Sequence, residues 1–416
     1  MADLLRVRRR RRIAKALVGI AIAVLPLAGL GCDRLLTVPP DADDRFDQPF
    51  GDLGAGELGR FLEGRTQFRR GFAINEGLGP IFNNRSCASC HSGDGRGFPE
   101  NRLTRFSRGT DLIPAEGGPQ IQDKAIPGAE PEVLPPGVDL SLRLPPPVFG
   151  MGLIEAIPES AILAHEDAGD ADADGISGRA NWVTPASYVP AGEPGGGAGP
   201  RVGRFGRKAQ VPALLQQAVE AYHQDMGITS SFQPAEIENA AATRAGVNPD
   251  RVSDPEIGGG IVGSVLNYLR MLAPPGPGEW NDSRRRGETV FQSIRCASCH
   301  VPTLRTTAGA DSLPQLTDQD VTLYSDLLLH DLGDGLADHR PDGSADGREW
   351  RTAPLWGLRI VREFLQGRVL LLHDGRARSV EEAILLHGGE AQAARDAFAG
   401  LSPEDRAALV DFVESR

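Results

Sequence analysis

The chain has 416 residues, of which 44 are Lys or Arg and 56 are Asp or Glu, and its formal net charge is −12. This acidic excess disfavours nucleic acid and anionic lipid surfaces as binding partners. The length suggests two or three domains. The content of 51 Gly, 32 Pro and only 6% aromatic residues indicates a loop-rich chain with little aromatic material for a core.

The N-terminus predicts an export signal. Basic residues from Arg6 to Lys15 precede the uncharged apolar run 16–31, which is too short to predict a membrane span. Cys32 then suggests a lipoprotein cleavage site with an acylated Cys; plain cleavage and a retained anchor are the alternatives. We therefore expect a signal peptide over 1–31, a polar, Pro- and Asp-rich tether over 32–56, and a periplasmic or other extracytoplasmic location.

Two nearly identical cysteine motifs, at 87–91 and 296–300, read Cys-Ala-Ser-Cys-His. C-x-x-C-H is the c-type haem attachment signature, in which two thiols bond the vinyl groups of one haem and the adjacent His reaches the iron. Two structural zinc sites are the alternative, but each would need four ligands, and no further Cys pairs exist. The sequence predicts two covalently bound c-type haems held by Cys87, Cys90 and His91 and by Cys296, Cys299 and His300, with the two His as iron ligands.

The remaining cysteine count limits other redox chemistry. Of five Cys, only Cys32 is left over, so no pair remains for a dithiol–disulfide centre. Phe82 and Phe291 each stand five residues before the first Cys of a motif, which makes the two motifs look like an internal repeat of a cytochrome c domain.

Local patterns predict mostly helices and loops. Residues 110–147 are rich in Pro and Gly and predict irregular structure, and the Pro- and Gly-rich run at 274–278 marks a domain boundary. We predict a mainly α fold of two cytochrome c-type haem domains, at 57–275 (with a large insertion) and 276–416, joined by long irregular loops. The predicted helices cover 57–74, 208–226, 256–272, 379–387 and a last helix with Ser402 as N-cap, Pro403 at its first position and Asp405 at its third.

Two acidic features are candidates for chemistry. Glu155 interrupts the apolar segment 148–157 and is either a helix-surface residue or an acid–base group that faces a haem pocket. Asp170, Asp172 and Asp174, followed by a Gly, have the opening spacing of a calcium loop. The closing bidentate Glu of an EF-hand is absent, so a solvated acidic loop is the alternative.

Several stretches resemble the bacterial di-haem oxidoreductases that are named as peroxidases: the segments 77–91, 326–331, 349–352 and 373–377. More distantly, the chain is similar to di-haem cytochrome c peroxidases and to the methylamine-utilisation di-haem enzyme. Some family members are named thiol oxidoreductases, which the Cys count does not support here. One departure is Arg207, where the family usually has Trp. The resemblance implies two facing cytochrome c domains, often with a calcium ion near their interface.

The resemblance further implies that one haem is a six-coordinate electron store and that the other has an open site for peroxide. Glu155 is the candidate acid–base group, because peroxide must first lose a proton and its leaving oxygen must then gain one. The candidate distal ligands or relays are Met226, His330 and His387, with a buried core Met as the alternative for Met226. The candidate propionate-binding or structural residues are Arg351, His373 and Arg376.

We therefore expect a peroxidase that reduces hydrogen peroxide with electrons from a small cytochrome or cupredoxin. A non-catalytic di-haem electron carrier and a di-haem oxidase of an organic or protein substrate are the alternatives. The long stretch between the two motifs favours an enzyme, since a bare carrier needs little more than two haem-binding wraps.

Overall fold

The computed structural model describes residues 46–416 except 96, 238, 240–247, 308–312 and 365–368. The predicted signal peptide, Cys32 and most of the predicted tether lie outside the described residues. Helices hold 34% of the residues and strands 12%, so helix outweighs strand, as predicted. Over the described ranges, no helix is both long and apolar enough to cross a membrane.

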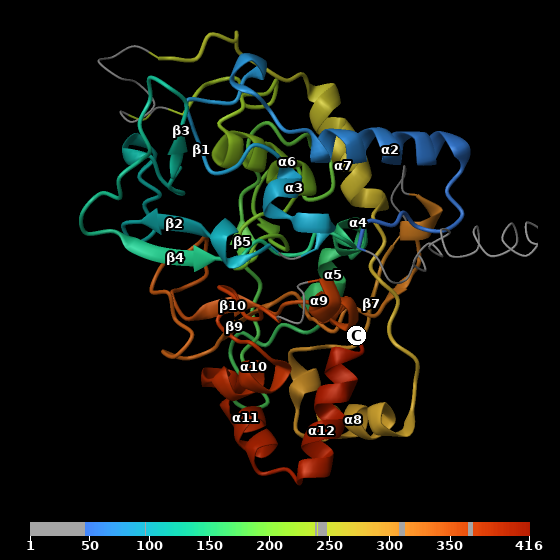
Figure 1. Ribbon diagram of the computed structural model, residues 1–416. Coiled ribbons are helices and arrows are strands. Elements are labelled where there is room, and N and C mark those ends of the chain that lie inside the picture. Colours follow the sequence, from blue (N-terminus) through green and yellow to red (C-terminus); the bar gives the residue numbers. More distant parts are fainter. Residues whose placement is uncertain (1–45, 96, 238, 240–247, 308–312, 365–368) are drawn as a thin grey trace, which may run out of the picture. The chain divides into compact units, whose positions relative to one another are not determined.

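Two crossed pairs of helices organise the fold, and in each pair the first helix precedes a cysteine motif (Figure 1). Helix α2 (Ala55–Arg69) packs against α7 (Gly259–Met271), and α8 (Asp282–Ser293) packs against α12 (Pro403–Glu414). The predicted capping of the last helix is confirmed, because the Ser402 side chain accepts a hydrogen bond from the backbone N–H of the third helical residue.

A glycine allows the close approach in both pairs. A Cβ atom on Gly64 of α2 would lie 2.1 Å from the carbonyl oxygen of Ser264 in α7. A Cβ atom on Gly287 of α8 would lie 2.0 Å from the carbonyl oxygen of Ala408 in α12. Any side chain at either glycine would therefore push the two helix backbones apart.

A phenylalanine one turn after each glycine repeats the correspondence. The ring centroid of Phe68 lies 6.3 Å from that of His91, and the ring centroid of Phe291 lies 6.4 Å from that of His300. Each Phe also contacts an aromatic ring of the later helix, at 5.3 and 5.4 Å between centroids. The internal repeat is therefore present in the packing, but the counterpart of Phe291 is Phe68 and not Phe82, which lies in a strand.

The remaining helices are short and surround the two motifs. The predicted helix over 208–226 begins only at Leu214, because the preceding segment folds back on itself through a bridge between Phe205 and Val211. These helices are α3 (Cys87–Cys90), α4 (Met151–Ala156), α5 (Glu159–Leu163), α6 (Leu214–Glu220) with its π-helical continuation (Ala221–Asp225), α9 (Leu358–Phe364), α10 (Val380–Leu386) and α11 (Gln392–Ala399).

In the part of the chain that the structure describes, the strands pair into five two-stranded antiparallel sheets. The prediction that 110–147 is irregular is wrong for the short strand β3 (Lys124–Ala125) and for β4 (Asp139–Arg143), which pairs with β2 (Leu103–Ser107) over five residues. A strand usually turns its apolar side chains inward and its polar side chains outward. In β4 this is reversed, because Ser141 and Arg143 face inward, whereas Leu140 and Leu142 are 44% and 39% exposed. The pairs are β1 (Ile81–Phe82) with β3 (Lys124–Ala125), β2 (Leu103–Ser107) with β4 (Asp139–Arg143), β5 (Trp182–Val183) with β6 (Arg201–Val202), β7 (Leu304–Arg305) with β8 (Asp320–Val321), and β9 (Leu329–Asp331) with β10 (Glu349–Arg351).

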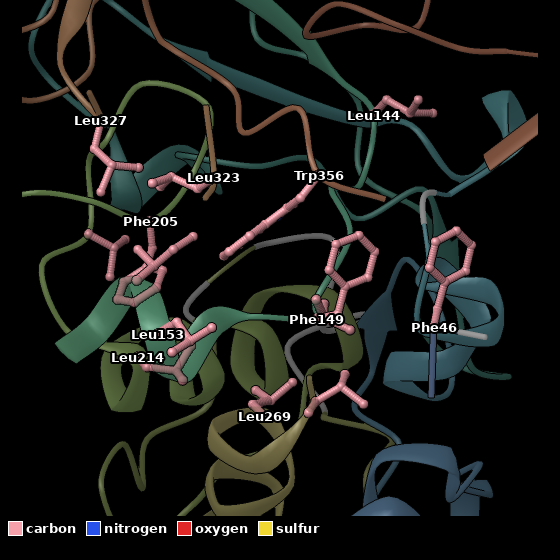
Figure 2. Close-up of a cluster of buried hydrophobic side chains, with 14 of the residues drawn as sticks. Phe46, Leu144, Phe149, Leu153, Phe205, Leu214, Leu269, Leu323, Leu327 and Trp356 are labelled. Carbon is pink, nitrogen blue, oxygen red and sulfur yellow. The ribbon is translucent and has the colours of Figure 1, made fainter. Parts of the chain in front are cut away.

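One hydrophobic core extends across the predicted boundary at 276. Figure 2 shows Leu153, Leu214 and Leu269, which precede that boundary, in one cluster with Leu323 and Trp356, which follow it. The described end of the predicted tether joins the same cluster through Phe46 (Figure 2). The halves that carry the two motifs thus stabilise each other through buried apolar surface.

Candidate functional site

Each cysteine motif opens onto its own large cavity. The first cavity has a volume of about 1810 Å³ when the space open to solvent is counted, and Cys87, Cys90 and His91 contribute to its wall. Helix α6 and its π-helical turn form another side of this cavity, and buried Met226 follows that turn. Since π-helical turns often occur at functional sites, this one marks the wall that carries Met226.

The second cavity surrounds the second motif and has a volume of about 1580 Å³ on the same measure. Its wall includes Cys296, Cys299 and His300 from the motif. Helices α10 and α11 supply another side, and the lining is largely apolar, as expected for a cofactor site. Three further histidines, His330, His373 and His387, also line this cavity.

The two motif histidines are held in the same way. The Nδ1 atom of His91 lies 2.7 Å from the Pro146 carbonyl oxygen, and that of His300 lies 2.9 Å from the Tyr324 carbonyl oxygen. Because a carbonyl oxygen only accepts, Nδ1 carries the proton in both rings and Nε2 keeps a lone pair. Burial lowers the pKa of each imidazole to about 4, so both are neutral at pH 7. A neutral imidazole oriented through its other nitrogen is the usual form of a metal-ligating histidine.

His387 has the same arrangement in the second cavity. Its Nδ1 lies 2.6 Å from the Ala383 carbonyl oxygen one turn earlier, at the end of α10. Burial lowers the pKa of the ring, which leaves a neutral imidazole with Nε2 free of that bond. His387 is therefore built like His300, and both line the same cavity.

His330 is built differently, because both of its ring nitrogens contact carboxylates. Its Nε2 lies 2.8 Å from Asp326 Oδ2, and its Nδ1 lies 2.7 Å from Glu390 Oε2 and 3.4 Å from Cys299 Sγ. Burial alone would lower the pKa of His330, but these hydrogen bonds raise it well above the usual value. A doubly hydrogen-bonded imidazolium offers no lone pair to iron, so the geometry supports the relay prediction for His330 over the ligand prediction.

His373 forms part of a stacked cluster. Its ring lies parallel to that of Trp350, with 3.7 Å between centroids, and the ammonium of Lys208 lies 4.4 Å from the Trp350 ring centroid. Lys208 is fully buried and donates to Asp338 Oδ1 at 2.8 Å and to two backbone carbonyl oxygens. This cluster fixes His373 at the wall of the second cavity, which fits the predicted structural role.

Among the described residues, no disulfide joins any two of the four motif cysteines. Burial raises the pKa of Cys90 and of Cys296 to about 12, and it also raises the pKa of Cys299. A raised pKa disfavours the thiolate form that disulfide exchange requires.

A buried cationic cluster borders the first cavity. Arg143 and Arg340 contact Asp342 Oδ2 at 2.9 Å, and Arg105 lies 3.6 Å from the same oxygen. Arg105 and Arg143 line the cavity, as does Arg204. Asp342 alone cannot neutralise three guanidinium groups, and the charge of Asp338 also acts on Arg143 and Arg340.

Unsatisfied polar atoms show what kind of group this wall fits. Among the described residues, no hydrogen-bond acceptor serves Arg143 Nη2 or Arg204 Nε, and the hydroxyl of Tyr222 also has no partner. All three side chains are buried and line the first cavity. Buried donors of this kind call for an anionic acceptor, and the two propionates of a haem supply one.

Two carboxylates also line the first cavity. Glu220 accepts from Gln216 Nε2 at 2.7 Å, and burial raises its pKa. Asp225 accepts from Gln120 Nε2 at 2.6 Å, and burial raises its pKa to about 6. A carboxyl group whose pKa approaches neutrality can both hold and release a proton at pH 7.

Glu155 occupies a different position from the one predicted. Its Oε2 accepts from Arg270 Nε at 2.6 Å, and its Oε1 accepts from the Leu214 backbone N–H at 3.3 Å. It is not among the residues that line either cavity. These contacts join α4, α6 and α7 and support a structural role, so the geometry gives no support to Glu155 as the acid–base group.

The two arginines predicted to bind propionates, Arg351 and Arg376, lie in different places. Arg351 lines both cavities, as does Arg207, the residue that departs from the family pattern. Arg376 lines neither cavity and instead donates to Asp374 Oδ2 at 2.8 Å and to the Gly335 carbonyl oxygen at 3.0 Å. The geometry thus favours Arg351 over Arg376 as a partner of a propionate.

The predicted calcium loop brings a different set of carboxylates together. Oxygens of Asp167, Asp170 and Asp172 lie within 4.8 Å of one another. Asp174 points elsewhere and forms an ion pair with Arg295, next to the second cysteine motif. Calcium binding at this loop stays a prediction, with Asp167 in place of Asp174 in the set.

A family comparison agrees with the prediction that the two cavities hold haem. The model of the family described as "Di-haem oxidoreductase, putative peroxidase" matches residues 39–103 and 128–416, so the chain belongs to this family and has haem cofactors. No curated protein matches. Among solved structures, a chain of Kuenenia stuttgartiensis hydrazine synthase pressurized with xenon is similar over 92% of this chain and 93% of its own, with 15% identity and a TM-score of 0.37.

Proposed function

We propose that this protein is an extracytoplasmic di-haem peroxidase, which reduces hydrogen peroxide to water with electrons from a small cytochrome or cupredoxin. One c-type haem is held in each cavity by the paired cysteines of its motif. The family match supports the oxidoreductase class. The substrate, the donor and the covalent attachment are part of the proposal.

Covalent attachment is tested by mass. The exported protein should carry the added mass of two haems, and replacing Cys87 and Cys90 by Ser should remove one of them. The same replacement at the second motif should remove the other. Exported protein without any added haem mass would contradict the proposal.

The orientation of His387 is the observation that supports different roles for the two cavities. His387 presents the same neutral imidazole as His300 to the second cavity. Among the described residues that line the first cavity, His91 is the one histidine, and a second ligand there would be the thioether of Met226 or Met151. We assign electron storage to the second cavity, where His300 and His387 would both ligate a bound iron, and peroxide to the first cavity, because imidazole binds ferric iron better than the soft thioether does.

The residues of the first cavity suit proton transfer to peroxide. A bound haem supplies an iron that binds peroxide and passes electrons to it. Reduction to two waters consumes two electrons and two protons, so the chain must take a proton from one oxygen and deliver protons to the leaving oxygen. Glu220 is placed for this task, because it lines the first cavity and burial raises the pKa of its carboxyl group, and Asp225 lines the same cavity. The charge of Arg105 acts on both carboxyl groups and lowers their pKa, so Arg105 supplies positive charge at this wall.

The spectrum of the protein tests this assignment. Oxidised protein should contain one low-spin haem with two imidazole ligands, and His387→Ala should convert that haem to a high-spin form. His165→Ala is the matched control, because His165 is exposed and lines neither cavity. A low-spin signal that survives in His387→Ala would refute the assignment.

Steady-state measurements separate the peroxidase from the alternatives. A peroxidase should consume peroxide and oxidise two equivalents of a reduced donor cytochrome per peroxide. Two low-spin haems that do not react with peroxide would identify an electron carrier. Oxidation of an organic or protein substrate without any donor turnover would identify an oxidase.

We also propose export and lipid attachment at Cys32. The basic residues and apolar run before Cys32 support this location. Labelled fatty acid should appear on the protein in producing cells and should be lost in Cys32→Ser. A chain that stays in the cytoplasm would contradict both the location and the haem attachment.

A further inference from the structure

Two arginines stand in the wall that the two cavities share. Five described residues line both cavities, and three of them, at 353, 354 and 358, are apolar. Arg207 and Arg351 are the two charged members of this set. Any charge in this position acts on the contents of both cavities at once.

The backbone holds both guanidinium groups at this wall. Arg207 is 8% exposed, and its Nε and Nη2 donate to the Leu144 carbonyl oxygen at 3.1 and 2.7 Å. The Nε of Arg351 donates to the Gly206 carbonyl oxygen at 3.0 Å, and its backbone N–H donates to the Arg207 carbonyl oxygen at 3.0 Å. The two arginines are therefore positioned relative to each other by the main chain.

The charge at this wall is retained at pH 7. Burial lowers the pKa of Arg351 to about 10, which is still above neutrality. The charge of Asp326 acts on Arg351, but among the described residues no ion pair of 4 Å or less joins Arg351 to a carboxylate. A carbonyl oxygen satisfies the hydrogen-bonding needs of a guanidinium group without cancelling its charge.

We propose that Arg207 and Arg351 form a shared cationic wall that raises the reduction potentials of both haems. This inference rests on the proposed occupancy of both cavities. Reduction adds an electron to the iron, and a nearby positive charge in a poorly solvated site stabilises that state. Where either arginine pairs with a propionate, its loss also exposes the iron to an uncompensated negative charge, so both effects have the same sign.

Redox titration of the haem-loaded protein, followed by absorption, tests the shared wall. Arg207→Gln should move both midpoint potentials to more negative values, and Arg207→Lys should restore most of the shift because it keeps the charge. Arg351→Gln should give the same pattern. Two controls each line one cavity: Arg105→Gln should lower the potential of the first haem alone, and Arg295→Gln that of the second alone.

The shift in the midpoint potential of each haem decides whether the shared cationic wall exists. A shift in only one potential, or in neither, in both Arg207→Gln and Arg351→Gln would overturn it. If one of these variants fails to fold, the other provides the measurement. The titration requires no peroxide, so a protein whose two potentials shift together supports the shared wall even if peroxide turnover is absent and the proposed function fails.

Discussion

Replacing Glu390 by Gln tests the charged His330 at the second cavity. Glu390 Oε2 lies 2.7 Å from His330 Nδ1, and the side chains are 11% and 4% exposed. A hydrogen bond with a charged partner contributes about 1.5–3 kcal/mol. We expect Glu390→Gln to lower the free energy of unfolding by about that amount at pH 6, where the imidazole is protonated.

The pH dependence gives this prediction its sign. Burial alone would lower the pKa of His330, but its hydrogen bonds to Asp326, Cys299 and Glu390 raise it well above the usual value. A raised pKa in the folded state means that the stabilisation is complete below the unfolded-state pKa, about 6.5, and is lost as the pH rises through the folded-state pKa. The difference between wild type and Glu390→Gln should therefore shrink in alkaline solution.

Urea unfolding of both proteins at pH 6 and at a series of alkaline pH values measures this difference. Glu381→Gln is the matched control, because Glu381 is a half-exposed α10 residue whose ion pair with Arg406 spans 3.4 Å. Its effect should stay within about 0.5 kcal/mol at every pH. A wild-type advantage that is constant or grows with pH would show that His330 is neutral and would refute the reasoning.

Four further predictions follow from the contacts of single side chains. Lys208→Met should lower the free energy of unfolding by about 3–5 kcal/mol, because it leaves a buried carboxylate unpaired; a loss under about 1 kcal/mol in urea unfolding would argue against the buried ion pair. Glu220→Gln should slow the reaction with peroxide by about 10²–10⁴-fold in stopped-flow measurements while leaving stability unchanged, and an unaltered rate would remove Glu220 from the proposed role. Glu155→Gln should lower the free energy of unfolding by about 1.5–3 kcal/mol, because the Glu155 carboxylate contacts Arg270, and it should leave the rate of the reaction with peroxide unchanged. Calcium at about 100 times its dissociation constant should stabilise the wild type by about 2.7 kcal/mol in thermal unfolding but not Asp170→Asn, and no calcium effect on the wild type would dismiss the site.

Sequence reasoning located what depends on residues close together in the chain. Each C-x-x-C-H motif lines a cavity, and His91 and His300 have the orientation that iron binding requires. The last helix also begins as predicted, since its capping signal lies within four residues of sequence from Ser402. Local patterns of this kind need no knowledge of the rest of the fold.

The acid–base residue shows where such reasoning ends. Glu155 and Glu220 both lie on short helices next to apolar residues, and periodicity does not tell which helix face meets which cavity. The fold pairs Glu155 with Arg270, which is 115 residues away, and leaves Glu220 at the first cavity. No comparable signal marks Glu220 in the sequence, because its neighbours three and four residues away in the predicted helix over 208–226 are all polar, which indicates a solvent-facing side.

The buried cationic cluster at the first cavity was not predicted from the sequence, for a related reason. Arg105 and Arg143 come from paired strands, and Arg340 comes from the other half of the chain. Arg143 points inward where a leucine would be expected, so the strand pattern hides both the strand and its charge. Only long-range pairing brings such residues to one carboxylate, Asp342, and no local signal predicts it.

The segment 144–147 makes the two halves of the molecule inseparable. The Pro146 carbonyl orients His91, and three consecutive prolines give this strap a fixed path without N–H groups of its own. Its first residue is anchored from the other half, because the Leu144 N–H donates to the His373 carbonyl oxygen at 2.8 Å. A fragment that ends at 275 would lose this anchor and with it the support of its own iron-binding imidazole. If a single-haem unit was duplicated to make this chain, its two halves now depend on each other for folding, and neither half alone should bind haem as it does in the full chain.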